Sequence, residues 1–332
     1  MVKWVLTIIN NNTDPRYNLA LEEYVLKNLP QDDYILLWQN EPSIIIGRNQ
    51  NTIEEINSEY VKKHNIHVVR RISGGGAVYH DFGNLNYTFV TKNSRDNLNN
   101  FRKFTKPVID ALRSLGVNAE FAGRNDILIE GKKFSGNAQT YHQDRMFHHG
   151  TILFDADLNM VSKVLQVKLE KIQSKGIKSN RSRVTNVLPF LENKMNIKEF
   201  QNYLLTFFLE TEDIDSKTYK LSEADFLKIN KLYKDKYSTW EWNYGESPDY
   251  ELEKEQRFAG GKVNLKLNVS EGAIKDLKIF GDFFGKKEVS ELEVLLTGVK
   301  LTKENLINAL KDIDINEYFY NVTMDEFINL FL

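Results

Sequence analysis

Cysteine is missing from the 332 residues of this sequence. Its absence excludes a disulfide framework, a thiolate nucleophile and a zinc site with cysteine ligands. Long apolar runs are missing as well, because no stretch approaches the roughly 18 apolar residues that a membrane-spanning helix needs. The first ten residues turn polar too soon for a secretory signal, so we expect a cytoplasmic protein without a membrane partner.

An excess of positive charge is also missing. Lysine and arginine number 44 against 46 aspartate and glutamate residues, which gives a net charge of -2. That balance offers no electrostatic footprint for nucleic acid, and we expect no nucleic-acid partner. The hydrophobic share of 41% and the charged share of 27% are those of a globular protein, and the length allows two domains.

Strand-like and helix-like segments follow one another irregularly. Residues 34–38 and 43–46 predict short buried strands, whereas residues 101–115 predict a helix that ends at Gly116. Residues 53–63 predict one polar helix. Regular alternation of strand and helix is missing, which favours an α+β fold with mixed, largely antiparallel sheets over a doubly wound parallel sheet.

The pattern breaks over residues 238–248, and we place a domain boundary just beyond this segment. We predict a larger domain over residues 1–248 and a small α+β domain over residues 249–332. In the small domain, residues 261–269 and 274–280 predict a hairpin and the remainder predicts helices. In the larger domain, residues 168–183 are rich in lysine, serine and arginine and predict a mobile loop.

The segment RRISGGGAVYHDFGNLNYT, which begins at Arg70, carries the strongest local signal. Gly74, Gly75 and Gly76 form a loop segment without side chains, so a ligand can approach its backbone N–H groups. The spacing is neither that of a P-loop nor that of a dinucleotide-binding motif, and glycine runs also occur in ordinary turns. Arg70 and Arg71 should point to opposite faces of a strand, which lets one guanidinium reach a phosphate or carboxylate.

Three further groups of polar residues are candidates. Asn84 and Asn86 share one face of the strand that follows the loop, where they contact either solvent or a ligand. Lys133 begins a strand whose small residues leave room for a ligand, and its ammonium suits a small anionic centre. His148 and His149 diverge on a strand and lack a carboxylate at ligand spacing, so we favour one histidine contacting substrate over a metal site.

These segments together resemble the lipoate-protein ligases over nearly the whole chain. The matching stretches are DP from Asp14, NLALEE from Asn18, IGRNQN from Ile46, RRISGGGAVYHDFGN from Arg70, GRNDILI from Gly123, KFSGNA from Lys133, FHHGTIL from Phe147, GIKSNRSRVTN from Gly176 and WEWNYG from Trp240. Several such blocks in the same order are far more specific than any single motif.

The resemblance implies a catalytic domain like that of biotin protein ligases and class II aminoacyl-tRNA synthetases. It also implies two half-reactions. Lipoate and Mg²⁺-ATP first give lipoyl-adenylate and pyrophosphate. The lipoyl group then passes to a lysine on an apo lipoyl domain of a 2-oxoacid dehydrogenase complex, or on glycine cleavage H protein. ATP is then a substrate, and no tightly bound prosthetic group is expected. Related octanoyltransferases and lipoyl-amidotransferases use a cysteine thioester, a route closed to this chain.

The same resemblance implies roles for particular residues. Lys133 is the central catalytic residue, which bridges the lipoyl carbonyl and α-phosphate oxygens. The implied ATP and adenylate contacts are Arg71, Gly74, Gly75, Gly76, Ala77, Val78, Tyr79, Asn84, Asp126 and Lys133. The implied lipoate contacts are Leu19, Arg70, Lys133 and His149. Lys178, Arg181 and Arg183 belong to an adenylate-binding loop expected to close and exclude water. Asp126 alternatively holds Mg²⁺, and the sequence leaves that choice open.

Other functions remain open at this point. One alternative is a ligase that prefers octanoate or another medium-chain acid. The depth of the acyl slot would decide between this acid and lipoate. Another alternative is a non-catalytic acyl- or adenylate-binding paralogue, although retention of Lys133 with the full glycine block argues against this. Biotin is a weaker substrate candidate, because the loop lacks the arginine–glycine repeat of biotin ligases. No nucleophile elbow or Ser-His-Asp order supports a hydrolase.

Overall fold

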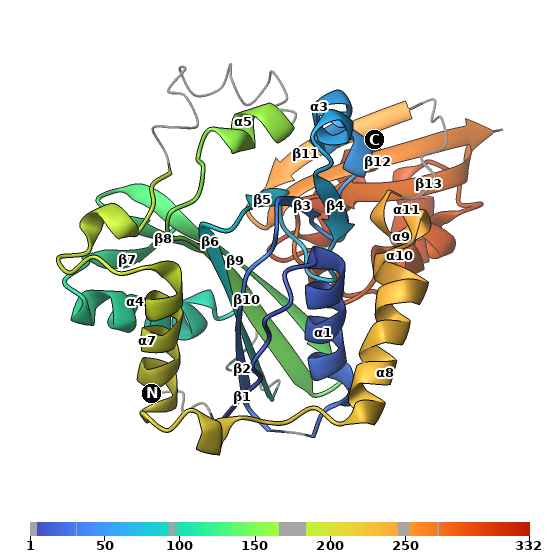
Figure 1. The fold of residues 1–332 in the computed structure, drawn as a ribbon. Helices are drawn as coiled ribbons and strands as arrows, with labels where there is room; N and C mark the ends of the chain where they lie inside the picture. The colour runs from blue at the N-terminus through green and yellow to red at the C-terminus, as the bar shows by residue number, and fades with distance from the viewer. Residues whose placement is uncertain are drawn as a thin grey trace.

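The computed structural model describes residues 5–30, 32–92, 97, 99–165, 184–244, 252–270 and 272–332. Within these ranges, no helix has the length and apolar character required to cross a membrane. Two sheets and their covering helices form the larger part of the molecule, and a third sheet with its own helices forms the C-terminal part (Figure 1).

The strands are β1 (Leu6–Thr7), β2 (Tyr34–Trp38), β3 (Ser43–Ile46), β4 (His67–Arg70), β5 (Val78–His80), β6 (Asn84–Lys92), β7 (Ala119–Ala122), β8 (Asp126–Ile129), β9 (Lys132–His142), β10 (Arg145–Leu153), β11 (Leu252–Phe258), β12 (Gly261–Ser270) and β13 (Ala273–Gly281). The α-helices are α1 (Pro15–Asn28), α2 (Thr52–Glu55), α3 (Ser58–Lys63), α4 (Phe101–Ser114), α5 (Met160–Val164), α7 (Ile197–Leu209), α8 (Glu223–Leu232), α9 (Trp240–Asn243), α10 (Val289–Leu296), α11 (Lys303–Leu310) and α12 (Met324–Phe331). A π-helical turn, Tyr233–Tyr237, extends α8.

The main sheet has seven strands in the order β1-β2-β6-β10-β9-β8-β7. Only its edge pair β1 and β2 is parallel, and the other neighbouring pairs are antiparallel. A second sheet has the order β4-β3-β5, in which β3 pairs with β4 in parallel and with β5 in antiparallel fashion. The prediction of an α+β fold with mixed, largely antiparallel sheets is confirmed.

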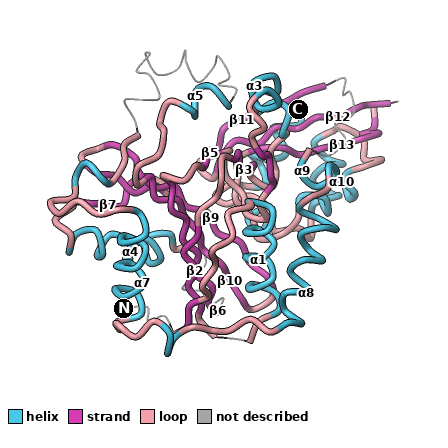
Figure 2. The backbone as a smooth tube through the Cα atoms, viewed as in Figure 1, coloured by secondary structure: helices cyan, strands magenta, loops and turns pink. Residues whose placement is uncertain are grey.

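Alternating side chains direct the two faces of the main sheet to different helices. In β2, Ile35 and Leu37 join the core beneath α4 and α7, whereas Leu36 and Trp38 join the core beneath α1 and α8. Figure 2 shows the strands running between these two helical layers. The face toward α1 is the one that carries polar side chains of β6, so the functional site forms on this side.

Helix α1 begins at Pro15, directly after a capping residue. The Asp14 side chain accepts a hydrogen bond from the Arg16 backbone N–H at 2.9 Å, and Pro15 occupies the first helical position. The buried face of α1 carries Leu19 among apolar neighbours, but it also carries Glu22. A carboxylate buried on a core-facing helix requires polar partners inside the fold. The position of α1 therefore brings Glu22 to the polar face of the main sheet.

Several predicted boundaries are wrong. The single helix predicted over residues 53–63 is two short helices, α2 and α3, because Ile56 between them is extended and only 1% exposed. Burial of this isoleucine against the core around α5 outweighs helical continuity. Strand β11 was not predicted, since its charged sequence LEKEQRF suits an exposed edge strand of a small sheet. The loop predicted over residues 168–183 lies outside the described residues.

The C-terminal part has its own core and touches the larger part at defined points. The predicted hairpin is confirmed as β12 and β13, and α10, α11 and α12 pack with this sheet around a separate apolar cluster. The backbone N–H of Gly281 donates to the carbonyl of Asn49 at 2.6 Å, and Arg48 forms an ion pair with Glu288. The predicted boundary at residue 248 falls between the described ranges and stays a prediction.

Candidate active site

A cavity lies between the glycine loop, α1 and the polar face of the main sheet. It encloses about 660 Å³, including space that is open to solvent. The cavity is lined by Leu19, Trp38, Ile45, Arg71, Gly75, Gly76, Ala77, Val78, His80, Asn86, Asn125, Lys133, Gly136, Asn137, Ala138, His149, Gly150 and Thr151.

Arg71 holds the glycine loop in shape from inside the protein. Its guanidinium donates to the carbonyls of Gly74 at 2.8 Å and Gly76 at 2.9 Å, to the carbonyl of Ile45 at 3.2 Å and to Ser73 Oγ at 3.0 Å. Burial lowers the pKa of Arg71 to about 10, so the group stays positive at neutral pH. A fixed cation therefore lies beside a loop whose glycines expose backbone to the cavity.

Arg70 is directed away from the cavity, as the alternation of strand residues predicts for one of the two arginines. Its guanidinium donates to the carbonyls of Gly47 at 3.0 Å, Arg48 at 2.9 Å and Gln50 at 2.6 Å. The same group donates to Thr52 Oγ1 at 2.6 Å. Arg70 is therefore not among the residues that line the cavity, and its contacts hold the segment around Arg48. The implied lipoate contact at Arg70 stays a prediction.

Lys133 reaches the cavity from the start of β9. Its ammonium lies 2.7 Å from Asp126 Oδ1, and 39% of the side chain is exposed. A Cβ on Gly136 would lie 2.9 Å from Lys133 Nζ, so the missing side chain leaves room for the lysine to fold along its own strand. The small residues of this strand thus leave room for one cation at the cavity wall.

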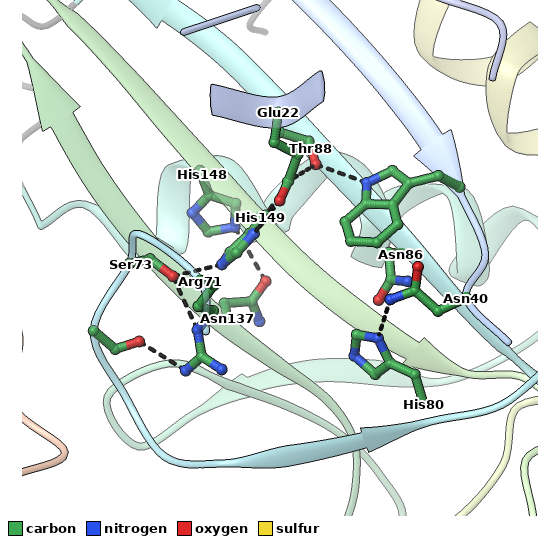
Figure 3. Close-up of polar contacts among 12 residues, drawn as sticks. Glu22, Asn40, Arg71, Ser73, His80, Asn86, Thr88, Asn137, His148 and His149 are labelled. Atoms are coloured by element: carbon green, nitrogen blue, oxygen red, sulfur yellow. Dashed lines mark hydrogen bonds and ion pairs between the residues drawn. The ribbon is translucent and has the colours of Figure 1, made fainter. Parts of the chain in front are cut away.

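His149 belongs to a hydrogen-bonded chain that crosses the site (Figure 3). Its Nε2 lies 2.7 Å from Ser73 Oγ, and its Nδ1 lies 3.1 Å from Glu22 Oε1. Ser73 Oγ accepts from Arg71 Nε at 3.0 Å. A carboxylate only accepts, so His149 Nδ1 carries a proton and donates to Glu22. The chain orders donors and acceptors from a buried cation to a buried carboxylate.

A second chain of hydrogen bonds also ends at the Glu22 carboxylate. Thr88 donates its hydroxyl proton to Glu22 Oε1, and Trp38 Nε1 donates to Thr88 Oγ1 at 3.0 Å. Trp38 lines the cavity, and its indole plane is thereby fixed. The sequence alone predicted no role for Glu22, because its partner His149 lies 127 residues further along the chain.

His148 faces the other side of the sheet, as predicted for adjacent histidines on a strand. Its ring stacks on Phe104 at 5.4 Å between centroids, Gln139 lies 3.1 Å from its Nδ1, and burial holds its pKa well below the usual range. His148 is therefore a neutral core residue. No group of three or more potential metal ligands occurs in the described ranges.

His80 is a lining residue that sequence reasoning missed. Burial, with smaller contributions from Arg71 and His149, lowers its pKa to about 3, so the ring is neutral at physiological pH. Its Nδ1 lies 3.0 Å from Asn40 Nδ2. The available signal in the sequence was the position of His80 between the glycine loop and Asn84. A strand residue at this position returns to the side of the loop that faces the cavity.

The structure brings many of the predicted site residues to the cavity. The predicted residues that line it are Leu19, Arg71, Gly75, Gly76, Ala77, Val78, Lys133 and His149. Asp126 adjoins it through Lys133, and Asn84 lies behind Asn86, to whose Oδ1 it donates at 2.9 Å. Gly74 packs beneath the carbonyl of Phe283. Tyr79 belongs to the apolar core next to the sheet β4-β3-β5. Lys178, Arg181 and Arg183 lie outside the described residues.

Comparison with known proteins identifies the family. Residues 14–209 match the family model of the lipoyl protein ligase A/B catalytic domain. The chain belongs to the lipoate-protein ligase family. Residues 247–331 match a second family model, the bacterial lipoate protein ligase C-terminus.

Whole-length relatives agree with these matches. The lipoate-protein ligase LplJ of Bacillus subtilis is 50% identical over 329 residues, which cover 98% of this chain and 99% of the relative. Lipoate–protein ligase 1 of Staphylococcus aureus is 51% identical over 323 residues, which cover 97% and 98%. The chain thus spans nearly the full length of these ligases.

Solved structures of this family share the fold. The P. falciparum LipL1 structure in complex with lipoate superimposes with a TM-score of 0.80 at 28% identity, covering 98% of this chain and 97% of that one. A lipoate-protein ligase A structure bound with ATP gives a TM-score of 0.63 at 31% identity, covering 73% and 99%.

Proposed function

We propose that this chain is an ATP-dependent lipoate-protein ligase. It activates lipoate to lipoyl-adenylate with release of pyrophosphate and then transfers the lipoyl group to a lysine of an acceptor protein. The observation that carries the proposal is the meeting of Lys133 with the Arg71-held glycine loop in one cavity. This cavity occurs in a chain about half identical to ligases of the same length.

Lys133 and the glycine loop bind the anionic groups of the substrates, the carboxylate and the α-phosphate. Attack of a carboxylate on the α-phosphate brings two anions together, so positioning and charge stabilisation are the main needs. The loop offers backbone N–H groups at Gly75 and Gly76. Arg71 holds the loop by donating to the carbonyls of Gly74 and Gly76. The Lys133 ammonium then exchanges its ion pair with Asp126 for contact with the carboxylate and α-phosphate oxygens.

The acyl end of the reaction falls to the apolar wall of the cavity. Leu19, Trp38, Ile45 and Val78 line this wall and suit an aliphatic chain. The Glu22 chain locks the Trp38 indole and the His149 ring in place, which gives the slot a fixed width. Medium-chain acids such as octanoate share the aliphatic chain, so the wall favours lipoate-like acids as a class.

Mg²⁺ fits the site as an ion carried by ATP. Mg²⁺ is usually held by one or two carboxylates together with substrate phosphates. Asp126 supplies one carboxylate beside Lys133, and 35% of its side chain is exposed and accessible. Asp126 would hold the ion, which supplies neutralisation of phosphate charge. The ion pair with Lys133 would then loosen, freeing the ammonium to move toward the substrate.

The acceptors we propose are apo lipoyl domains of 2-oxoacid dehydrogenase complexes and glycine cleavage H protein. A structure that is 33% identical to this chain, with a TM-score of 0.66, is described as part of an archaeal lipoylation system with a lipoate protein ligase and its E2 lipoyl domain. Because this chain has no cysteine, the acceptor lysine attacks the mixed anhydride directly rather than a protein thioester.

Exchange of labelled pyrophosphate into ATP tests the activation step and the role of Lys133. The wild-type protein should catalyse exchange that depends on lipoate, and Lys133→Ala should lower it by about 10²–10³-fold, because the developing charge loses its nearest cation. Lys132→Ala is the matched control, since this exposed neighbour on β9 should retain wild-type exchange. Unchanged exchange in Lys133→Ala would remove Lys133 from the reaction.

A further inference from the structure

A chain of asparagine side chains runs from the N-terminus of α1 to His80. The Asn18 amino group donates to the carbonyl of Gln39 at 2.9 Å and to Asn40 Oδ1 at 2.9 Å. Asn40 Nδ2 in turn lies 3.0 Å from His80 Nδ1. Asn18 and Asn40 are buried and do not line the cavity, whereas His80 does. This asparagine relay therefore connects a cavity residue to the loop before α1.

The relay determines which nitrogen of His80 carries the proton. The Asn18 amino group also lies 3.0 Å from the carbonyl of Asn12, and carbonyls only accept, so the orientation of the Asn18 amide follows. Asn40 must then turn its oxygen to Asn18 and its amino group to His80. An amino group only donates, so His80 Nδ1 is an acceptor, and the ring proton is on Nε2.

His80 Nε2 and Asn86 Nδ2 have no hydrogen-bond partner among the described residues, although both atoms are buried. His80 is 3% exposed and Asn86 is 2% exposed, and both residues line the cavity. Asn84 donates to Asn86 Oδ1 at 2.9 Å, which leaves the Asn86 amino group free to donate. Buried donors without partners are unfavourable and uncommon in folded proteins, so a ligand oxygen is the expected partner.

We infer that His80 is a substrate-binding donor and that Asn40 is the residue that positions it. Held by the Asn18–Asn40 relay, His80 presents its Nε2–H to the cavity together with the Asn86 amino group. Both donors are uncharged, and they suit acceptor oxygens on the substrate. Such oxygens occur on the carboxyl group of the acid and on the α-phosphate of the nucleotide, so the inference rests on the proposed function.

Figure 3 shows His80, Asn40 and Asn86 together, across the view from Ser73 and Arg71. Arg71 and His149 are the charged and titratable groups whose fields reach His80, and both oppose its protonation. A protonated His80 would place an Nδ1–H against the Asn40 amino group, so that two donors would face each other. The neutral tautomer with its proton on Nε2 instead accepts the hydrogen bond from Asn40. The donor is therefore present throughout the neutral range and does not depend on a titration.

Nitrogen-15 NMR of the wild-type protein tests the tautomer without any substitution in the relay. The His80 signals are assigned by their loss in a His80→Gln variant. The inference predicts protonation of Nε2 and an unprotonated Nδ1 at pH 7. It also predicts that the Nε2–H resonance shifts when lipoate or ATP is added. A proton on Nδ1, or a resonance that neither ligand moves, would overturn it.

Asn40→Asp tests the positioning role. A carboxylate cannot donate to Nδ1, so the ring proton should move to Nδ1 and the cavity should lose its donor. We expect the affinity for the ligand that His80 contacts, measured by calorimetry with lipoate and with ATP separately, to fall about tenfold. Asn11→Asp adds the same charge to the exposed loop before α1 without entering the relay, and it should leave both affinities unchanged.

The two ligand titrations distinguish the sources of the contacted oxygen. Loss of lipoate affinity identifies the carboxyl group, and loss of ATP affinity identifies the phosphate. A reversed His80 tautomer with both affinities unchanged would overturn the positioning role. If Asn40→Asp does not fold, the wild-type tautomer and its response to ligands still decide the inference. Failure of pyrophosphate exchange in a protein whose His80 is protonated on Nε2 would count against the proposed function and not against the relay.

Discussion

Gly76→Ala should affect ligand binding and the stability of the fold differently. A Cβ at Gly76 would meet no atom within 4 Å, and Gly76 is not among the glycines with positive φ. Replacement of a glycine by alanine at such a position stabilises a protein by about 0.4–1 kcal/mol through the unfolded chain. We therefore expect the thermal midpoint of Gly76→Ala to stay at or slightly above that of the wild type.

Ligand binding should respond in the opposite direction. The new methyl group would occupy the cavity side of the loop, where the nucleotide must approach the backbone. Displacement of a bound group by about 1 Å can cost about 10²-fold in rate, so we expect lipoate-dependent pyrophosphate exchange to fall by at least that order. The assay pairs thermal unfolding with calorimetric titration of ATP. A stable Gly76→Ala protein that binds ATP with wild-type affinity would refute the claim that this loop holds the nucleotide.

Gly74 provides the contrasting variant. A Cβ there would lie 2.3 Å from the carbonyl oxygen of Phe283, and ordinary contact of 3.4 Å requires a movement of roughly 1 Å. Gly74→Ala should therefore destabilise the packing of the C-terminal part by about 1–3 kcal/mol, the usual cost of overpacking. Two neighbouring glycines thus have predicted effects of different kinds, on binding at Gly76 and on stability at Gly74.

Two further predictions concern buried charges. Although burial opposes it, Lys236, with help from Lys27 and Tyr237, lowers the pKa of Glu23 to about 2 from 4.5. Glu23 therefore stabilises the fold by about 3 kcal/mol above pH 4.5, and this is lost as the pH falls toward 2. Glu23→Gln should flatten that acid dependence in urea unfolding, and an unchanged profile would contradict it. Arg71→Lys should lower stability by about 2–4 kcal/mol, because an ammonium cannot reach all the oxygens that the guanidinium binds, and unaltered urea unfolding would contradict this.

Much of the fold follows from local pattern. Strands β2 and β3 begin and end at the predicted residues, because their apolar side chains are buried on both faces. Strand β6 also follows its alternation, with Leu85 and Tyr87 in the core under α4 and Asn86 on the cavity side. Periodicity specifies which residues share a face, and burial then decides which face turns inward.

The parts that failed depend on contacts between distant segments. Alternation predicted that Arg70 and Arg71 diverge, but it could not say which guanidinium meets the cavity. The carbonyls around Arg48 decide this by occupying Arg70. The role of His80 was missed because it depends on Asn40, which lies 40 residues away in the sequence and 3.0 Å from His80 Nδ1 in the structure. The similarity to class II synthetases, the cytoplasmic location and the preferred acceptor stay predictions.

The most direct test of the central claim is the intact mass of an apo lipoyl domain incubated with this protein, lipoate, Mg²⁺ and ATP. The account predicts a gain equal to one lipoyl group that requires ATP. It predicts the same gain without ATP when preformed lipoyl-adenylate is supplied. No gain under either condition, with an acceptor that another ligase can modify, would contradict the account, as would a gain from free lipoate in the absence of ATP.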